Sequence, residues 1–482
     1  MTNDDLPFGG LDPEQFRAYG KQVIDWIADY LARAERYPVL AQVKPGEVKR
    51  QLPDAPPTLP EPMDAILADF ERVIVPGITH WNHPAFFAYF ATSGSAPGIL
   101  GELLSAALNV NGMLWRTSPA ATELEEVALN WLRQMIGLPS EFEGVIADTA
   151  SVSTLVAVAA ARESLNRRVR EDGLAGRSDL PRLRMHCSEQ AHSSVEKAGI
   201  VLGVGQAGVR KIAVDAAFRM RPDLLAAAID EDRRAGWLPF CVVATVGTTS
   251  STSIDPLPPI ADICARENLW LHVDGAYGGM AAIVPEMRHV LAGCERADSI
   301  VVNPHKWLFT PIDCSAFYTR RVEALKRAFS LVPEYLRAAQ DDVKNYMDYG
   351  VQLGRRFRAL KLWFVIRAYG VGGLVSHVRE HCRLAREFAG WVDADPDFER
   401  LAPVPFSTVC FRYRPEGEAD ESELERLNAT LLEAVNASGQ AFLSHTKLNG
   451  KYTLRLAIGN VGTHERHVAR AWQLLQEKAV QL

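Results

Sequence analysis

A lysine at the end of an apolar run is the residue of this sequence best suited to covalent chemistry. Lys306 lies in the segment NPHKW (303–307), directly after Ser299 to Val302, whose β-branched residues predict a buried strand. Pro304 cannot continue that strand, so Lys306 is expected on the turn at its end. Apolar neighbours would disfavour the charged amine, lower the pKa of the lysine and make it a nucleophile. The alternative is a surface lysine beside a packed tryptophan, which the local sequence alone favours.

A carboxylate ends a second apolar run. The segment LWLHVDGAYGG (269–279) predicts a strand that stops at Asp274, and Asp274 lies 32 positions before Lys306, which leaves room for a helical crossover between parallel strands. Pyridoxal 5′-phosphate requires this pair of side chains. An aspartate pairs with the pyridinium nitrogen and keeps the ring an electron sink, while a lysine holds the aldehyde carbon.

The segments HVDGAYGG and NPHKW resemble the group II pyridoxal-phosphate decarboxylases. Two further segments narrow this resemblance to the aromatic-L-amino-acid decarboxylases: HWxxPxFFAYF, which begins at His80, and WxxSPAxTELE, which begins at Trp115. The resemblance extends from about Phe16 to the last predicted helix, nearly the whole chain. It implies an enzyme that uses pyridoxal phosphate and has the fold called type I.

Strand–loop–helix units repeat from Gly144 to about Phe317, which predicts an α/β fold with a mostly parallel, doubly wound sheet. Three parts are expected: an N-terminal helical arm and linker (1–85), a large cofactor-binding domain (86–371) and a small α+β C-terminal domain (372–482). The arm begins with a capping Asp12, and its amphipathic helix must pack on something else. The resemblance implies a homodimer with the active site at the subunit interface.

The predicted cofactor residues come mainly from the resemblance. A helix that begins after Thr149 offers free amides for the phosphate, and His192 is expected to stack on the pyridine ring. Asp148 departs from the family, which more often has glycine there. Independently of the family, several of these residues follow predicted strands, at the sheet edge where ligands bind in doubly wound folds. The complete predicted set is Thr149, Ala150, Ser151, His192, Thr249, Asp274, Ala276, Asn303, His305 and Lys306.

The substrate residues also come from the resemblance. The expected pocket residues are Trp81, Tyr89, Phe90, Thr92, His192 and Gly354, although aromatic side chains are found more often in cores than in pockets. In the family, the residues just before Trp115 come from the neighbouring subunit and close the pocket. Here they are Asn111, Gly112 and Met113, which are less aromatic than expected. Gly354 leaves space for an indole or a catechol.

The expected catalytic residues are Lys306, Asp274, His192 and Tyr335, with Tyr335 as proton donor to the α-carbon. They predict decarboxylation of an aromatic L-amino acid to the amine and CO2, with tryptophan, 5-hydroxytryptophan or Dopa ahead of tyrosine. The closest alternative is an aldehyde synthase, in which phenylalanine tends to replace the loop tyrosine or asparagine the stacking histidine. An aminotransferase and a binding protein without cofactor are less favoured alternatives.

Composition limits the partners. The chain of 482 residues carries 52 basic and 59 acidic side chains, for a net charge of −7. This balance indicates neither nucleic acid nor an anionic membrane surface as a partner. The acidic start and the short apolar runs predict a cytoplasmic protein without a membrane span. The seven cysteines form no CxxC pair, and no metal site is expected; His186 and Cys187 lack further ligands for zinc.

Overall fold

The computed structural model describes residues 10–331, 343–418 and 420–482. Seven strands form one sheet in the order β1-β7-β6-β5-β4-β2-β3. They are β1 (Glu143–Ala147), β2 (Leu183–Ser188), β3 (Val209–Ile212), β4 (Leu238–Thr245), β5 (Trp270–Asp274), β6 (Ser299–Val302) and β7 (Ser315–Thr319). The strands from β2 to β6 pair in parallel, whereas β7 is antiparallel to both β1 and β6. The predicted mostly parallel sheet is confirmed, and the reversed β7 within it was not foreseen.

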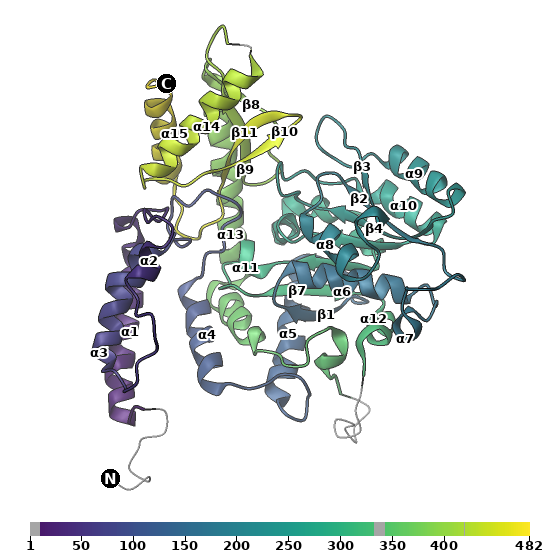
Figure 1. Ribbon diagram of the computed structural model, residues 1–482, viewed down its shortest axis with the longest axis horizontal. Helices are drawn as coiled ribbons and strands as arrows, with labels where there is room; N and C mark the ends of the chain where they lie inside the picture. The colour runs from purple at the N-terminus through teal and green to yellow at the C-terminus, as the bar shows by residue number, and fades with distance from the viewer. Residues whose placement is uncertain (1–9, 332–342, 419) are drawn as a thin grey trace.

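Helices cover both faces of this sheet (Figure 1). Along β4, Val242 and Ala244 join one hydrophobic core, while Cys241 and Val243 join a second core on the opposite face. Strands buried on both faces are expected to be apolar at successive positions, as β4 is. The helices of the large domain are α4 (Ala96–Leu108), α5 (Pro119–Met135), α6 (Ala150–Glu163), α7 (Val169–Asp172), α8 (Ser193–Val201), α9 (Pro222–Arg234), α10 (Leu257–Glu267), α11 (Pro304–Trp307) and α12 (Val322–Phe329).

A long helix, α13 (Arg358–Ala394), links the large domain to the C-terminal part and contains non-helical backbone at Gly370, with φ of 62°. Glycine accepts this left-handed conformation without a steric penalty. By length and apolar composition alone, α13 passes as a candidate membrane span. Its residues Leu362, Val378 and Leu384 nevertheless lie in the protein core.

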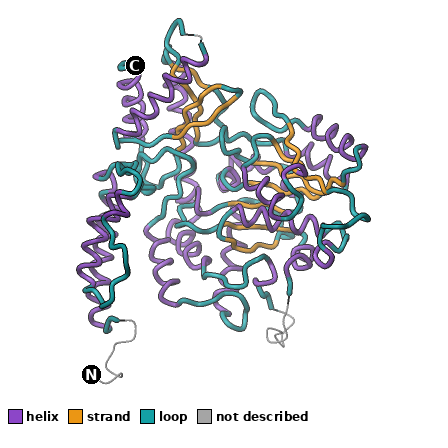
Figure 2. The backbone as a smooth tube through the Cα atoms, in the orientation of Figure 1, coloured by secondary structure: helices purple, strands orange, loops and turns teal. Residues whose placement is uncertain are grey.

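The C-terminal part holds a second, antiparallel sheet, which is separate from the first in Figure 2. Its strands follow the order β10-β11-β9-β8, and helices α14 and α15 belong to the same part. The segment 85–91 packs against this sheet, since Phe87 N donates to Phe442 O at 2.8 Å. The predicted domain borders stay a prediction. The elements are β8 (Phe398–Arg400), β9 (Thr408–Tyr413), α14 (Glu421–Ala437), β10 (Ser444–Leu448), β11 (Lys451–Ala457) and α15 (Glu465–Ala479).

The N-terminal arm lies along one side of the molecule, away from the seven-stranded sheet (Figure 1). It contains α1 (Pro13–Ala32), α2 (Glu47–Arg50) and α3 (Met63–Asp69). The predicted start of α1 is confirmed, because Asp12 and Gln15 form a reciprocal capping box. Trp26 of α1 packs edge-on against Phe70, with ring centroids 4.9 Å apart. No residue of α1 is buried within the chain.

Candidate active site

Lys306 lies in α11, a single helical turn. This turn follows the carboxyl end of β6. Its Nζ is 5.3 Å from the ring centroid of Phe90 and makes neither a hydrogen bond nor an ion pair with any residue that the structure describes. Burial lowers the pKa of the lysine, and the charge of Asp274 partly opposes this shift. The amine is therefore held near an acid without being neutralised by it, as a nucleophilic lysine requires.

Asp274 is the last residue of β5 and is 5% exposed. Its Oδ1 accepts a hydrogen bond from Ala276 N at 3.1 Å, which fixes the carboxylate at the strand end. Its Oδ2 accepts none within the described parts of the chain. One oxygen thus orients the side chain, and the other is available to a protonated ring nitrogen. The predicted cofactor residue Ala276 lies beside it and is also buried.

His192 is the N-cap residue of α8, immediately beyond β2. Its Nδ1 accepts a hydrogen bond from Ser194 N at 3.2 Å and lies 2.8 Å from Ser194 Oγ. The neutral imidazole therefore carries its proton on Nε2. Burial lowers the pKa of His192, while Asp274 raises it and Lys306 lowers it further. Electrostatic interaction thus connects His192, Asp274 and Lys306, which come from three different strand ends.

The predicted phosphate residues lie at the start of α6. Thr149 is the N-cap, and Ala150 and Ser151 occupy the first turn, where backbone amides have no acceptor within the helix. Asn303 and His305 support the neighbouring turn: Asn303 Oδ1 accepts from Ser315 Oγ at 2.7 Å. The backbone N–H of Cys314 donates to His305 Nδ1 at 3.0 Å. Burial lowers the pKa of His305 to about 3 and keeps the ring neutral.

Three aromatic rings form a stack beside Lys306. Phe90 lies 3.8 Å from Tyr277, and Tyr277 lies 4.7 Å from Trp307, both in nearly parallel arrangements. Trp307 Nε1 donates to His381 Nδ1 at 3.0 Å, which joins the stack to α13. Phe90 is therefore the predicted pocket residue whose contact with Lys306 is direct. Tyr277 sits inside the HVDGAYGG segment, yet sequence reasoning gave it no role.

Several other predicted site residues are exposed or partly exposed in the single chain, and their roles stay a prediction. Trp81 and Tyr89 form a separate stacked pair, with centroids 6.0 Å apart. Thr92 is partly exposed, and Thr249 is exposed on the turn after β4. Gly354 is also exposed, and a Cβ built there would lie 3.9 Å from Asn111 Nδ2. Tyr335 lies outside the described residues.

Arg455 is a site residue that sequence reasoning missed. This arginine of β11 is 4% exposed, and its guanidinium lies over the outer part of the same site, 5.4 Å from the Phe90 centroid. It donates to Ser250 O at 2.8 Å and to Ser444 Oγ at 3.0 Å, while its Nη2 has no hydrogen-bond partner among the described residues. The signal was present in the sequence as an arginine inside the apolar strand run LRLAI.

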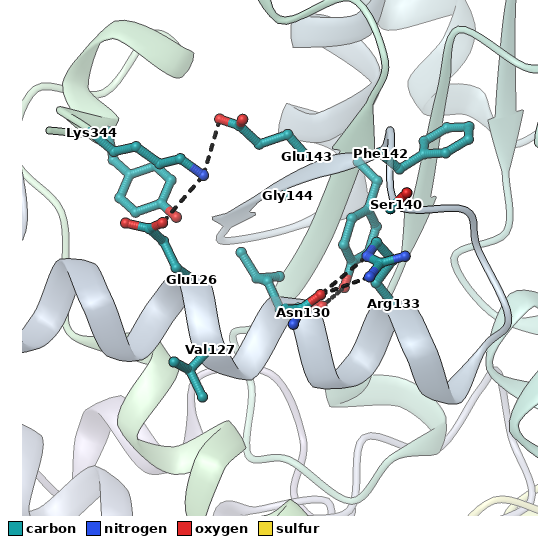
Figure 3. A pocket seen from close by; sticks show the side chains of 12 residues that line it. Glu126, Val127, Asn130, Arg133, Ser140, Phe142, Glu143, Gly144 and Lys344 are labelled. Carbon is teal, nitrogen blue, oxygen red and sulfur yellow. Dashed lines mark hydrogen bonds and ion pairs between the residues drawn. The ribbon is translucent and has the colours of Figure 1, made fainter. Parts of the chain in front are cut away.

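A separate cavity of about 350 Å³ lies between α5, β1 and the turn around Tyr346. Figure 3 places Lys344 between Glu126 and Glu143, with Nζ–oxygen distances of 3.3 and 3.4 Å. None of the predicted site residues lines this cavity. It is distinct from the cluster around Lys306.

The pyridoxal-dependent decarboxylase conserved domain matches residues 45–414. This chain belongs to that family. The family uses pyridoxal phosphate, and the residues here fit it: an amine without an acid partner, a buried carboxylate with one available oxygen, and hydroxyls with free amides at a helix start. When bound, the cofactor takes up the electron pair of the bond that breaks.

Relatives and solved structures agree with the family assignment along the whole chain. Tyrosine decarboxylase 3 of Petroselinum crispum is 43% identical, over 99% of this chain and 94% of the relative. Phenylacetaldehyde synthase of Arabidopsis thaliana is 44% identical, over 97% of this chain and 96% of the relative. The structure of Oryza sativa TDC with PLP and tryptamine superposes with a TM-score of 0.94 at 40% identity, covering 98% of this chain and 99% of that one.

Proposed function

We propose that this protein is an aromatic-L-amino-acid decarboxylase, which converts its substrate to the aryl amine and CO2. The observation that carries the proposal is the cluster of Lys306, Asp274 and His192 beside the ring of Phe90. A buried amine next to a carboxylate suits the cofactor, and a neighbouring aromatic stack suits an aromatic side chain. The relatives include a tyrosine decarboxylase, and a solved neighbour is bound to tryptamine.

In this proposal each residue has a separate task. Lys306 would hold the cofactor aldehyde, and Asp274 would keep the proton on the ring nitrogen. His192 would lie against the ring as a neutral imidazole, and its hydrogen bond from Ser194 N to Nδ1 fixes its orientation. Tyr335 would donate a proton to the α-carbon of the substrate.

The order of substrates remains part of the proposal. Gly354 has open space around it, which suits the larger indole and catechol rings, so tryptophan, 5-hydroxytryptophan and Dopa are placed first. Tyrosine belongs in the same test, because a tyrosine decarboxylase is among the relatives at 43% identity. Arg455 lies 5.4 Å from the ring centroid of Phe90 and adds a cationic group beside that ring.

An aldehyde synthase is the second candidate function, because a phenylacetaldehyde synthase is 44% identical to this chain. Such an enzyme would consume O2 and water and would release aldehyde, CO2, ammonia and hydrogen peroxide, with no amine. His192 and Tyr335 favour simple decarboxylation, since the synthases that this chain resembles tend to replace one of the two.

We propose that the enzyme is a cytoplasmic homodimer with its active site at the interface. The amphipathic helix α1 buries no residue within the chain, and Phe16 is 68% exposed. Helix α4 also exposes a row of leucines. Apolar surface of this extent is typical of an interface. The leucines are Leu100, Leu103, Leu104 and Leu108.

One experiment tests the proposed reaction and the alternative together. The purified, cofactor-loaded enzyme is given tryptophan, 5-hydroxytryptophan, Dopa, tyrosine and phenylalanine in parallel, and amine, CO2, aldehyde and hydrogen peroxide are assayed. Amine and CO2 in equal amounts without peroxide support the decarboxylase. Aldehyde with stoichiometric peroxide would replace it by the synthase, and no product from any aromatic substrate would reject both.

A further inference from the structure

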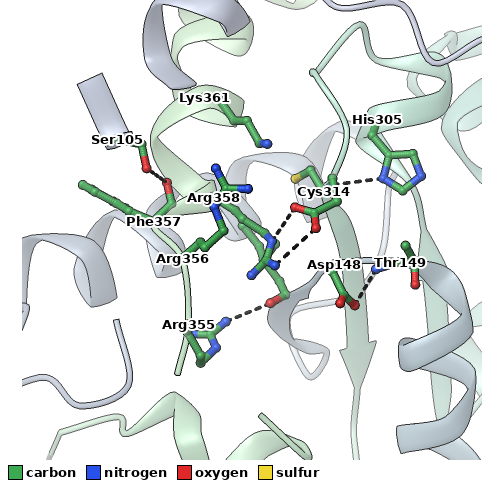
Figure 4. A network of polar contacts seen from close by, with 12 residues as sticks. Ser105, Asp148, Thr149, His305, Cys314, Arg355, Arg356, Phe357, Arg358 and Lys361 are labelled. Carbon is green, nitrogen blue, oxygen red and sulfur yellow. Dashed lines mark hydrogen bonds and ion pairs between the residues drawn. The ribbon is translucent and has the colours of Figure 1, made fainter. Parts of the chain in front are cut away.

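Asp148 occupies the turn between β1 and the predicted phosphate residues of α6. Its Oδ1 accepts a hydrogen bond from the backbone N–H of Thr149 at 2.8 Å, and its Oδ2 accepts one from Gln352 Nε2 at 3.1 Å. Figure 4 places Asp148 beside Thr149 and in the neighbourhood of Arg358. Both carboxylate oxygens are therefore committed within the chain, one of them to an amide at the start of α6.

This arrangement works against an anion at the same turn. The N-terminal amides and the dipole of α6 attract a phosphate, but Asp148 occupies the Thr149 amide and adds a negative charge. Arg358, whose charge interacts with that of Asp148, does not cancel it, because the Arg358 guanidinium is bonded to Asp313 at 2.7 Å. Asp148 contributes only a long-range part of the rise in the pKa of Arg358, after Asp313.

The partner of Asp148 belongs to a segment that is fixed at several points. Arg355 N donates to Asn111 Oδ1 at 2.9 Å, and Arg355 Nη2 pairs with Glu125 at 2.6 Å. Met347 N donates to Met113 O at 3.1 Å. Gln352 is thus presented to Asp148 from a firm support. The three departures from the family at Asn111, Met113 and Asp148 all contact this one segment, 345–355.

We propose that Asp148 is a positioning residue that weakens retention of the cofactor phosphate, and that Gln352 limits this effect by holding the carboxylate. The inference rests on the proposed placement of the phosphate at Thr149 to Ser151. With Asp148 in this position, the enzyme exchanges its cofactor more readily than it would with a neutral residue at position 148. The segment 345–355, which also carries Gly354, then affects how long the cofactor stays bound.

The test compares wild type with Asp148→Asn, Gln352→Ala and the double variant. Each holoenzyme is dialysed against cofactor-free buffer, and the fraction of bound cofactor is followed by its visible absorbance. Asp148→Asn, which is nearly isosteric, should release the cofactor roughly tenfold more slowly, because one negative charge beside the proposed phosphate position is removed. Gln352→Ala should release it faster, because the carboxylate is freed. The double variant should behave like Asp148→Asn.

A second arm separates the charge effect from changes in folding. The four proteins, stripped of cofactor, are titrated with pyridoxal 5′-phosphate and with pyridoxal, which lacks the phosphate. Affinity for pyridoxal should be equal in all four, whereas affinity for pyridoxal 5′-phosphate should follow the dialysis order, with differences that shrink as salt is raised. Equal retention in wild type and Asp148→Asn would overturn the inference. Equal shifts for both ligands would also overturn it.

These results remain distinguishable from a failure of the proposed function. If the wild-type protein binds pyridoxal 5′-phosphate no better than pyridoxal, the phosphate placement itself is wrong. If it prefers the phosphorylated form but Asp148→Asn changes nothing, only the role of Asp148 falls. Thermal unfolding of each cofactor-free variant identifies any variant that lost affinity because it misfolded. Asp148→Glu keeps the charge and should release the cofactor at the wild-type rate.

Discussion

The region at the carboxyl ends of the parallel strands and the N-terminal arm differ in how much of their apolar surface they bury. Around β4, β5 and β6 the chain buries nearly every apolar side chain, and Lys306 and Asp274 are held inside that packing. In the arm, α1 has a well-formed capping box and an amphipathic pattern but no buried residue. A helix gains most of its stability from packing its apolar face. The cluster around Lys306 and Asp274 is therefore packed within a single chain, whereas the apolar face of α1 stays exposed in a single chain.

Two lysines of the large domain differ in whether an acid neutralises them. Lys361 is fully buried and pairs with Glu102 at 2.7 Å, whereas Lys306 has no acid partner at ion-pair distance among the described residues. A buried charge that loses its partner is costly, and a buried amine without a partner is spared that cost only by losing its proton. One lysine is thus paired with an acid, and the other, the proposed cofactor lysine, is not.

The largest expected effect is that of Lys306→Ala. Activity with any aromatic substrate should fall roughly 10³-fold or more, since removal of a covalent nucleophile has costs of that size. The melting temperature of the cofactor-free protein should stay the same or rise, because an unpaired buried amine is removed. Initial rates and thermal unfolding measure the two effects.

Lys361→Ala is the matched control for that experiment. It should lower the melting temperature clearly, because Glu102 is left without its partner in a packed region. Activity per folded molecule should change far less than for Lys306→Ala. Comparable losses of activity in the two variants would mean that Lys306 acts through the fold, and the division of tasks would be lost.

Acid should act on the sheet region before it acts on the arm. Burial lowers the pKa of His272 to about 4, and of His305 and His381 to about 3, from an ordinary 6.5. The unfolded chain takes up these protons first, so their stabilising contribution is complete above pH 6.5 and is lost as the pH falls toward 3. Asp255, whose pKa burial raises to about 6, changes stability in the opposite direction but is a single group.

We therefore expect the free energy of unfolding to fall by several kcal/mol between about pH 7 and about pH 5. Residues 10–78 contain no histidine, although Tyr30 of α1 bonds His80, so the protection of α1 against hydrogen exchange should change less over this range than the protection of β5 and β6, which should fall. Urea unfolding at each pH measures the total effect. A stability that rises toward pH 5 would contradict the buried neutral state of these histidines.

The next effect concerns the arm. Replacing Phe16, Val23 and Ile24 by serine removes exposed apolar side chains from one face of α1. The dimer should dissociate at roughly hundredfold higher protein concentration, because a few buried apolar side chains dominate such interfaces. Sedimentation velocity across a concentration series measures this. Serine at Leu59, exposed in the linker, is the control and should leave the dimer intact.

The sequence predicted the strand ends and their turns better than the contacts that surround them. The strand at Ser299 to Val302 and the turn at Lys306 were predictable because proline and β-branched residues act locally. Local signals of this kind need no knowledge of distant segments.

Contacts between distant segments could not be predicted from the sequence. Nothing local indicates that β7 inserts antiparallel between β1 and β6, because pairing order depends on the whole chain. Arg455 lies 149 positions after Lys306 and meets the same Phe90 ring only through the second sheet. Likewise, Asp148 was recognised as a departure from the family, but its partner Gln352 could not be named. Tyr335 stays a prediction.

The smallest expected effect separates the two regions most cleanly. Asp12→Ala removes the carboxylate that accepts from Gln15 N at 2.8 Å and should cost α1 about 1 kcal/mol. Because α1 is not buried within its own chain, this loss should leave the unfolding of the large domain unchanged and appear as a roughly fivefold weaker dimer. The matched change in a packed helix is Asp420→Ala, which removes the equivalent cap of α14 in the C-terminal part and should lower the unfolding free energy directly. If Asp12→Ala instead destabilised the monomer, α1 would have to contribute to the stability of the single chain, and the contrast between the arm and the packed regions would not hold.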